Sequence, residues 1–421
     1  MAVPAEKIQN AGDVSIDEVV IVTSTGSIQE VTPQVLAIEL YEDIFAPFLS
    51  GNVILKDSQE IVGLLPLIGE ELIRMTISTP SLDTKENISM EFMIYKMDDR
   101  QKLKDREIIY TLHFISKEAI VDLNRKLSRG YEGLISDMVQ DIYKKGLETT
   151  KNVNVEPTKN KTKFIANYWS PVKCLQFLAE QALNPNDSPS YVFFENNYGF
   201  HYVSLDTLYT GTVIKQRFIW DNYTAETRST GGSDRSIEKD YQRIIEFVQH
   251  PEWNYIDRLK SGMYGSQIMY FDLMTHQYVH VGYSPAFTKG NHLNKYPLWS
   301  GKVPQNSQAV MTREHQYYNA FDGYGDVSNT GMCQERRSLL AQAEGYKVSI
   351  NVLGRCDYHI GQRMYLEIPR MTQLKPDDPN YLDQLTSGCY LVSAICHKIN
   401  RAKHECTMEL VKDSYMRDIR Q

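Results

Sequence analysis

Closely spaced cysteine pairs are missing from this chain of 421 residues. None of its six cysteines forms a Cys-X-X-Cys pair. They are Cys174, Cys333, Cys356, Cys389, Cys396 and Cys406. Small secreted domains stapled by disulfides and zinc modules built on paired cysteines both use denser spacing. We therefore expect free thiols, several of them buried in strands, and no disulfide framework.

Excess positive charge is also missing. The chain has 45 Lys and Arg residues against 53 Asp and Glu, a formal net charge of −8. Proteins that grip nucleic-acid phosphates concentrate basic residues, so this balance argues against such a binder. It does not exclude a protein that DNA must pass without being retained.

Long apolar runs are absent as well. No stretch approaches the ~18 consecutive apolar residues typical of a membrane span. The first residues, 1–7, do not place a basic segment before an apolar one, so we expect no signal peptide and synthesis in a cytoplasm. Hydrophobic content of 42% and charged content of 23% are ordinary for a globular protein, and the length suggests about three domains.

Catalytic motifs are missing too. The sequence has no phosphate-binding glycine loop, no GxSxG nucleophile turn and no HExxH zinc helix. Gly231-Gly232 lies in a polar linker without the apolar helix that phosphate binding needs. The acidic pairs Glu70-Glu71, Asp98-Asp99 and Asp377-Asp378 lie in expected turns, where we interpret them as solvated charge. A glycosidase-type pair assembled from distant positions stays open. We expect no enzyme activity, no catalytic residues and no cofactor.

Metal sites receive little support. His276 and His280 are four residues apart in a segment that looks extended, where they cannot chelate one ion, so we expect surface histidines. The better zinc candidate combines Cys356 and His359 with Cys396 or His397. Adjacent strand residues point to opposite faces, so Cys396 and His397 cannot both bind. The prediction is therefore no metal site.

Short alternating strands dominate what is present. The chain has 27 Tyr and 14 Phe, which suit strand faces and interfaces. From Gly345 to Asp413 the sequence alternates buried-type and polar residues in four runs separated by turn signals. The runs are 346–352, 364–368, 389–396 and 404–411. Four such strands predict a small antiparallel β-barrel.

A similar pattern occurs near the N-terminus. Residues 69–80 parallel 361–369, and the hairpin 92–115 overlays the last hairpin without a gap, pairing Glu107 with Glu405 and Leu112 with Leu410. Two unrelated hairpins could agree as well, so the pattern by itself leaves an internal duplication open. The predicted class is mainly β with an α+β insert: two similar small antiparallel barrels and a mixed α/β domain.

The predicted organisation has four parts. Residues 1–125 form the first barrel domain, and 126–235 form the α/β insert, where the period changes to that of helices. Segments 236–284 and 345–421 form the second barrel domain. Residues 285–344 form an irregular insertion rich in aromatics. That insertion either contacts a partner or covers a barrel.

Several stretches together resemble the central hub of contractile phage baseplates. They are 192–206, 255–265 followed by 270–272, 361–368 and 388–408. Each motif has low specificity, but their order spans nearly the whole chain. The family comprises the T-even-type tail hub and the N-terminal region of type VI secretion spike proteins.

The resemblance implies a virion protein made in the host cytoplasm and placed in the tail baseplate. It implies a homotrimer whose two barrels per chain form a ring of six, which adapts a threefold central spike to a sixfold tail tube. Implied partners are a separate spike protein, since this chain ends after the barrel, tail tube proteins, baseplate wedge proteins and a tape measure protein. DNA would pass the channel without specific binding.

Candidate ring-forming residues lie on two strands that the overlay makes equivalent: Glu71, Ile73, Met75 and Ile77 on the first, and Arg363, Tyr365 and Glu367 on the second. Phe45 and Phe48 are expected packing residues. The leading function is a structural hub that forms the channel for genome ejection. The alternatives are the hub of a protein-delivering injection system, a tail-associated cell-wall hydrolase and a sugar-binding tail protein.

Overall fold

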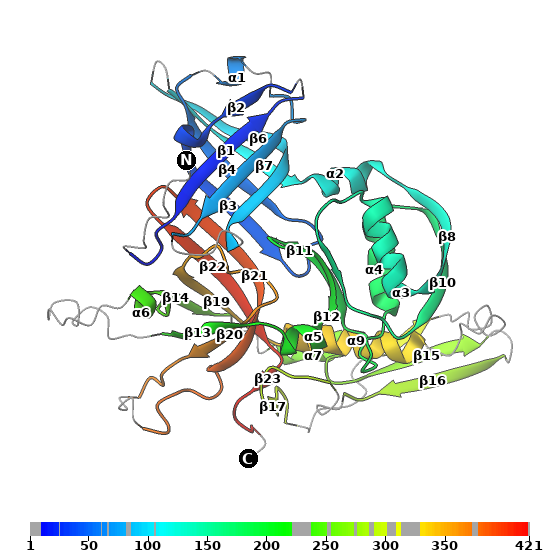
Figure 1. Cartoon of the computed structure of the whole chain (residues 1–421). Helices are drawn as coiled ribbons and strands as arrows, with labels where there is room; N and C mark the ends of the chain where they lie inside the picture. The colour runs from blue at the N-terminus through cyan, green and yellow to red at the C-terminus, as the bar shows by residue number, and fades with distance from the viewer. Residues whose placement is uncertain are drawn as a thin grey trace.

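A computed structural model describes residues 10–24, 26–59, 61–64, 67–80, 86–104, 107–220, 237–250, 254–272, 276–285, 290–300, 309–312, 329–372 and 378–419. Two β modules and an α/β insert make up this part of the chain (Figure 1). The fold class predicted from sequence is confirmed. Within the described residues, every helix is too short or too polar to cross a bilayer.

The first module holds six main strands, with the short β2 (Ile28–Glu30) at its edge. They are β1 (Ser15–Val22), β3 (Val35–Asp43), β4 (Ser50–Asp57), β5 (Leu72–Ser78), β6 (Ile88–Lys104) and β7 (Glu107–Ser116). The spatial order is β3-β4-β7-β6-β5-β1, and all neighbours are antiparallel. Alternate residues of these strands pack into one apolar core, as their period of two predicts. The short α1 (Ile61–Leu64) lies at the tip.

The second module repeats this order. Its strands are β13 (Val213–Ile219), β14 (Ile244–Gln249), β19 (Tyr346–Leu353), β20 (Arg363–Glu367), β21 (Gly388–Asn400) and β22 (His404–Lys412). They lie in the order β14-β19-β22-β21-β20-β13, which is the order of the first module strand for strand. One difference is that β13 runs parallel to β20, whereas β1 is antiparallel to β5. Among the described residues, strand pairing leaves both modules open, apart from one isolated parallel bridge between Ile219 and Arg243 that connects the end of β13 to the residue before β14.

Two β-bulges recur at matching places in the modules. The register shifts between Val35 and Ala37 on β3, and between Ile244 and Glu246 on the equivalent β14. It also shifts between Ile94 and Lys96 on β6, and between Val392 and Ala394 on β21. Bulges are position-specific features of related sheets, so these matches support an internal duplication more strongly than the sequence pattern does.

The gapless overlay of the two hairpins predicted from sequence is wrong on their returning strands, β7 and β22. Ile94 lies opposite Phe114, and Val392 lies opposite Leu410, so Leu410 is equivalent to Phe114 and not to Leu112. The reason is hairpin length, because β6 carries two further register shifts before its turn. Sequence spacing could not reveal these extra residues.

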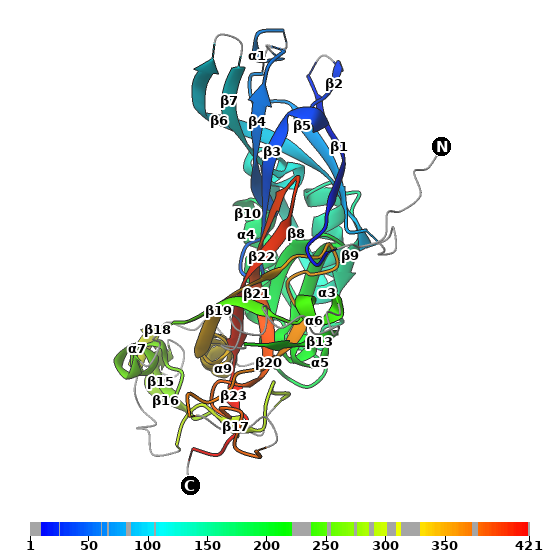
Figure 2. The ribbon, with the colours of Figure 1, turned by 90° about the vertical axis from the view of Figure 1, so that its left-hand side faces the viewer.

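The two modules share one continuous sheet. Strand β3 of the first module pairs with β21 of the second, from Ala37 opposite Asn400 to Asp43 opposite Ala394. Figure 2 shows β21 and β22 running from the second module up against the first. At the end of this hairpin the Arg401 guanidinium donates to the backbone carbonyls of Thr32, Pro33 and Val35. The joint is therefore built from backbone pairing.

The α/β insert lies beside the joint and has its own apolar core. It contains β8 (Leu127–Leu134), β9 (Val153–Val155), β10 (Lys161–Trp169), β11 (Tyr191–Asn196) and β12 (Gly199–Ser204), with α2 (Lys117–Asn124), α3 (Ile135–Asp141), a π-helical turn (Ile142–Gly146), α4 (Pro171–Gln181) and α5 (Leu205–Thr210). Local sequence determines its helix boundaries: Ser170 caps α4 by accepting from the Lys173 amide at 3.3 Å, and Pro171 follows in the first turn.

A third group of elements lies below the insert. Strands β15 (Ser266–Asp272), β16 (Gln277–Tyr283) and β18 (Ala309–Thr312) form a separate sheet, with α7 (Tyr255–Ser261) and α9 (Asn329–Ala343) nearby. The predicted second domain, 236–284 and 345–421, includes β15 and β16 and leaves out β13. The sheet topology separates β15 and β16 from the second module and joins β13 to it. The remaining small elements are α6 (Ile237–Tyr241), β17 (Tyr296–Pro297) and β23 (Ser414–Tyr415).

Candidate functional site

The predicted ring-forming residues of the first module lie on β5 or, in the case of Glu71, directly before it, and their side chains are buried. Ile73, Met75 and Ile77 are fully buried in the module core. Glu71, expected in a solvated turn, is also buried, because its carboxylate accepts the backbone amides of Ile68 at 2.8 Å and Gly69 at 2.9 Å. That interpretation of Glu71 was wrong. The outward face of β5 carries Leu72, Arg74 and Thr76.

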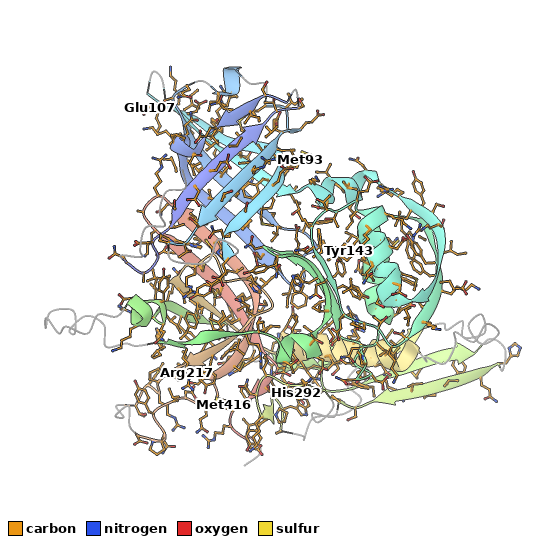
Figure 3. All side chains as sticks on the ribbon, in the orientation of Figure 1. Met93, Glu107, Tyr143, Arg217, His292 and Met416 are labelled. Carbon is orange, nitrogen blue, oxygen red and sulfur yellow. The ribbon has the colours of Figure 1, made fainter. Side chains whose placement is uncertain are left out.

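Their counterparts on β20 point the other way. Arg363, Tyr365 and Glu367 are half-buried on the outer face, whereas Met364, Leu366 and Ile368 fill the core. Arg363 donates to the carbonyl of Gly211, and Glu367 pairs with Arg217 of β13 at 3.0 Å. Figure 3 shows Arg217 on the outside of the second module. The two predicted sets therefore lie on opposite faces of equivalent strands, and their role in a ring stays a prediction.

The expected packing residues differ from one another. Phe45 is 44% exposed, whereas Phe48 packs edge-on against Phe200 of the insert. Phe48 thus joins the first module to the insert, and Phe45 is available to a partner.

Among the strand edges that have no partner in the described residues, two are important for assembly. The outer edge of β14 is free, and its Ile245 and Val248 are 46% and 43% exposed. Residues 95–104 of β6 also have a free edge, since β5 pairs only with 88–93. Within the chain, the equivalents of these two edges, β3 and β21, pair with each other. Unpaired edges of this kind favour association with another chain.

A buried charged network connects the first module to the insert. The Lys151 ammonium contacts Glu118 at 2.8 Å and Glu195 at 2.6 Å, and both carboxylates are buried. Glu195 also accepts the Leu49 amide at 3.0 Å and the Ser116 hydroxyl at 2.5 Å. Burial raises the pKa of Glu195, and the Lys151 charge opposes this shift. These contacts give both carboxylates a structural role.

A polar cavity of about 320 Å³ lies between the insert, α9 and the C-terminal strands. Two of its carboxylates, Asp206 and Asp413, hold a loop: Asp206 accepts the Asn291 amide at 2.5 Å, and Asp413 accepts the Leu293 amide at 3.1 Å and the His292 ring at 2.6 Å. Figure 3 marks His292 at this place. Both carboxylates therefore fix the loop against the insert and the C-terminal strands.

The predicted insertion 285–344 is partly described. Tyr296 pairs with Tyr415 as β17 pairs with β23, and Asn294 bonds both Cys389 and Ser414. This part of the insertion therefore covers the end of the second module. The other aromatics noted from sequence, Tyr317, Tyr318, Phe321 and Tyr324, lie outside the described residues, so a partner-binding role for them stays a prediction.

Two histidines and a cysteine meet in the joint between the modules. His397 Nδ1 lies 3.0 Å from His404 Nε2, and Cys406 Sγ lies 3.3 and 3.4 Å from these two nitrogens. All three side chains have no exposed surface. Burial lowers the pKa of His397 to about 4 and that of His404 well below its ordinary value, so both rings are neutral near pH 7. Among the described residues, this is the one cluster of three side chains that could together hold a metal ion.

Sequence reasoning chose different partners for these residues. Cys396 is half-exposed and points away from His397, as expected for strand neighbours. Cys356 and His359 bond elsewhere, to the carbonyls of Ile77 and Ile360. His276 and His280 are exposed, as expected for surface histidines. The missed signal was the hairpin itself: His404 and Cys406 alternate on one strand, and the turn at 401–403 brings His397 opposite Cys406.

Comparisons with solved structures find the same fold in phage tail proteins. The chain is similar to a tail protein from Neisseria meningitidis MC58 at 10% identity and a TM-score of 0.54, covering 95% of this chain and 97% of that one. It is similar to the 43 kDa tail protein of prophage MuSo2 from Shewanella oneidensis at 10% identity and 0.55, covering 94% and 99%. A prophage tail protein from Listeria monocytogenes EGD-e matches at 10% identity and 0.50, covering 94% of both.

No protein-family model matches the sequence, and a comparison with curated proteins finds no match. The structural likeness therefore stands at the level of the fold and extends over nearly the whole chain. In agreement with the resemblance suggested by the sequence, the chain has the fold of these phage tail proteins.

Proposed function

We propose that this chain is a structural protein of a phage tail baseplate: a trimeric hub that adapts a threefold spike to a sixfold tail tube and forms the channel for genome ejection. The observation that carries the proposal is the duplicated β module, with the same strand order and the same two bulges in both copies. The shared fold with phage tail proteins supports it.

The repeated joint suggests how three chains would assemble. Inside one chain, β3 of the first module pairs with β21 of the second. The equivalent pair is β14 of the second module with the free half of β6 of a first module. One chain cannot make this pair with itself, because six strands, from β19 to β7, separate β14 from β6 in its sheet order. If the next chain supplies β6, the same contact alternates within and between chains around a ring.

This arrangement accounts for exposed apolar residues at both edges. Ile245 and Val248 on β14 and Tyr95 and Leu103 on β6 are each between 43% and 52% exposed. An edge strand with exposed aliphatic residues is an aggregation hazard unless something covers it. A ring contact would cover both edges at once.

The first experiment is light scattering on the purified full-length chain. The hub proposal predicts a particle of about three times the mass of one chain, since closed rings favour one defined oligomer. Images of that particle should show a pore surrounded by six similar densities. An assay on purified peptidoglycan belongs beside it, because the alternative of a cell-wall hydrolase predicts turnover. A monomer that hydrolyses peptidoglycan would contradict the hub.

A hub that delivers proteins would have the same fold and the same trimer. No contact in the described part of the chain favours that cargo over DNA, so genome ejection stays the proposal on the resemblance alone. Spike, tube, wedge and tape measure proteins are its proposed partners.

A further inference from the structure

We propose that His397, His404 and Cys406 bind a zinc ion inside the joint between the two β modules. The three donor atoms are two ring nitrogens and one sulfur, and they come from a single hairpin, β21 and β22. Imidazole and thiolate are the ligands that zinc takes in structural sites. This proposal replaces the sequence expectation of no metal site.

The spacing of the donors fits one ion. Nitrogen ligands ~2.0–2.1 Å and a sulfur ligand ~2.3 Å from a tetrahedral zinc lie about 3.3–3.6 Å from one another. The observed separations are 3.0 Å between the nitrogens and 3.3 and 3.4 Å from each nitrogen to the sulfur. Movements of a few tenths of an ångström would therefore place all three donors around zinc. They occupy three positions of a tetrahedron, as in sites that leave the fourth to a non-protein ligand.

The backbone brings these side chains together by strand pairing. His397 lies directly opposite Cys406, and His404 precedes Cys406 by two residues on the same face. Gly354 of the neighbouring segment makes room for the second ring: a Cβ at that position would lie 2.3 Å from His404 Cδ2. The Gly354 amide also donates to the His404 carbonyl at 2.8 Å, which holds the backbone there.

The surroundings of the cluster favour a bound ion. Around the cluster, Leu40 faces His397 from β3 and Val352 faces Cys406 from β19, so the setting is apolar. Burying polar rings in such a setting is costly unless they are bonded. A shared metal ion would supply strong bonds to all three groups at once.

The location gives the ion a structural role. His397 lies on β21, whose other edge pairs with β3 of the first module. Fixing the β21–β22 hairpin therefore fixes the strand through which the second module holds the first. Zinc bound here would stabilise the orientation of the two modules.

The test is the metal content of the full-length protein purified in the presence of Zn²⁺ and freed of loosely bound ions. We expect about one zinc per chain by elemental analysis. Replacing the ion with Co²⁺ should give a thiolate-to-cobalt charge-transfer band. The variant Cys406→Ala should lose the zinc and the band, and Cys396→Ala is the matched control on the opposite face that should keep both.

Wild-type protein that holds no more zinc than Cys406→Ala would overturn the proposal. So would a cobalt complex without the thiolate band, or zinc that is lost equally from Cys396→Ala. The wild-type measurement decides the matter even where Cys406→Ala fails to fold. Copper in place of zinc at the same residues would overturn the assignment of the ion.

Discussion

At the scale of single residues, Lys151 forms a buried ion pair that its place in a polar loop of the sequence does not predict. Its ammonium lies between two buried carboxylates, Glu118 and Glu195, that come from α2 and from β11. Burial by itself would lower the pKa of Lys151, but the two carboxylates raise it above its ordinary value. The lysine therefore stays charged and fixes the carboxylate of Glu195, which in turn bonds Leu49 and Ser116 of the first module.

We predict that Lys151→Met destabilises the protein by about 3 kcal/mol, because removing one partner of a buried ion pair leaves uncompensated charge. The difference in unfolding free energy between Lys151→Met and wild type should become smaller as the pH is lowered. Burial already raises the pKa of Glu195, so loss of the cation would leave a carboxyl that protonates readily and then needs no partner. Denaturant unfolding at several pH values measures this.

The matched control is Lys159→Met. Lys159 pairs with Asp187 at 2.6 Å, but both side chains are more than half exposed, so the loss should be at most ~1 kcal/mol. If both substitutions lowered the free energy of unfolding equally, the buried network would contribute no more to stability than a surface ion pair.

At the scale of elements, the free edge of β14 is the place where a ring contact can be tested. The His250 amide donates to the Lys347 carbonyl at 3.3 Å, so in this antiparallel pair the amides of alternate residues face β19. The amide of Gln249 then faces the free edge, and its side chain is exposed. Proline at this position would remove a donor to a neighbouring chain and none to β19.

Gln249→Pro should therefore weaken the trimer while the monomer keeps its fold. Light scattering over a dilution series measures the assembly, and circular dichroism with thermal unfolding checks the fold. Gln249→Ala is the control and should assemble as wild type does. A Gln249→Pro chain that assembles as tightly as Gln249→Ala would argue against β14 as the ring edge.

At the scale of the whole molecule, the acidic balance is what matters. A channel that conducts DNA must not hold phosphates, and a formal charge of −8 per chain favours repulsion over retention. We expect no measurable binding of duplex DNA to the full-length chain at physiological salt. Fluorescence anisotropy with a labelled duplex measures it, with the salt concentration varied because phosphate contacts are salt-dependent. Tight, salt-sensitive binding would contradict the proposed passage.

The sequence by itself determined the local structure. A period of two predicts which strand residues face a core, and it held for Val348 and Ile350 as well as for Met364 and Leu366. Helix ends are local features as well: Asn254 caps α7, and Gly262 ends it in the left-handed conformation. Such features depend on residues a few positions apart, so the order of neighbours in the chain is enough to predict them.

Tertiary structure alone decided how distant segments meet. Glu71 is buried because backbone amides surround its carboxylate, and Lys412 is buried under Tyr346 and Tyr390, with its ammonium held by the carbonyls of Thr386 and Ser387. Neither is visible in an alternating pattern. The pairing of β3 with β21 and the meeting of His397 with His404 and Cys406 depend on register and on bulges. Shifting a strand by one residue reverses its faces, and local sequence does not fix that register.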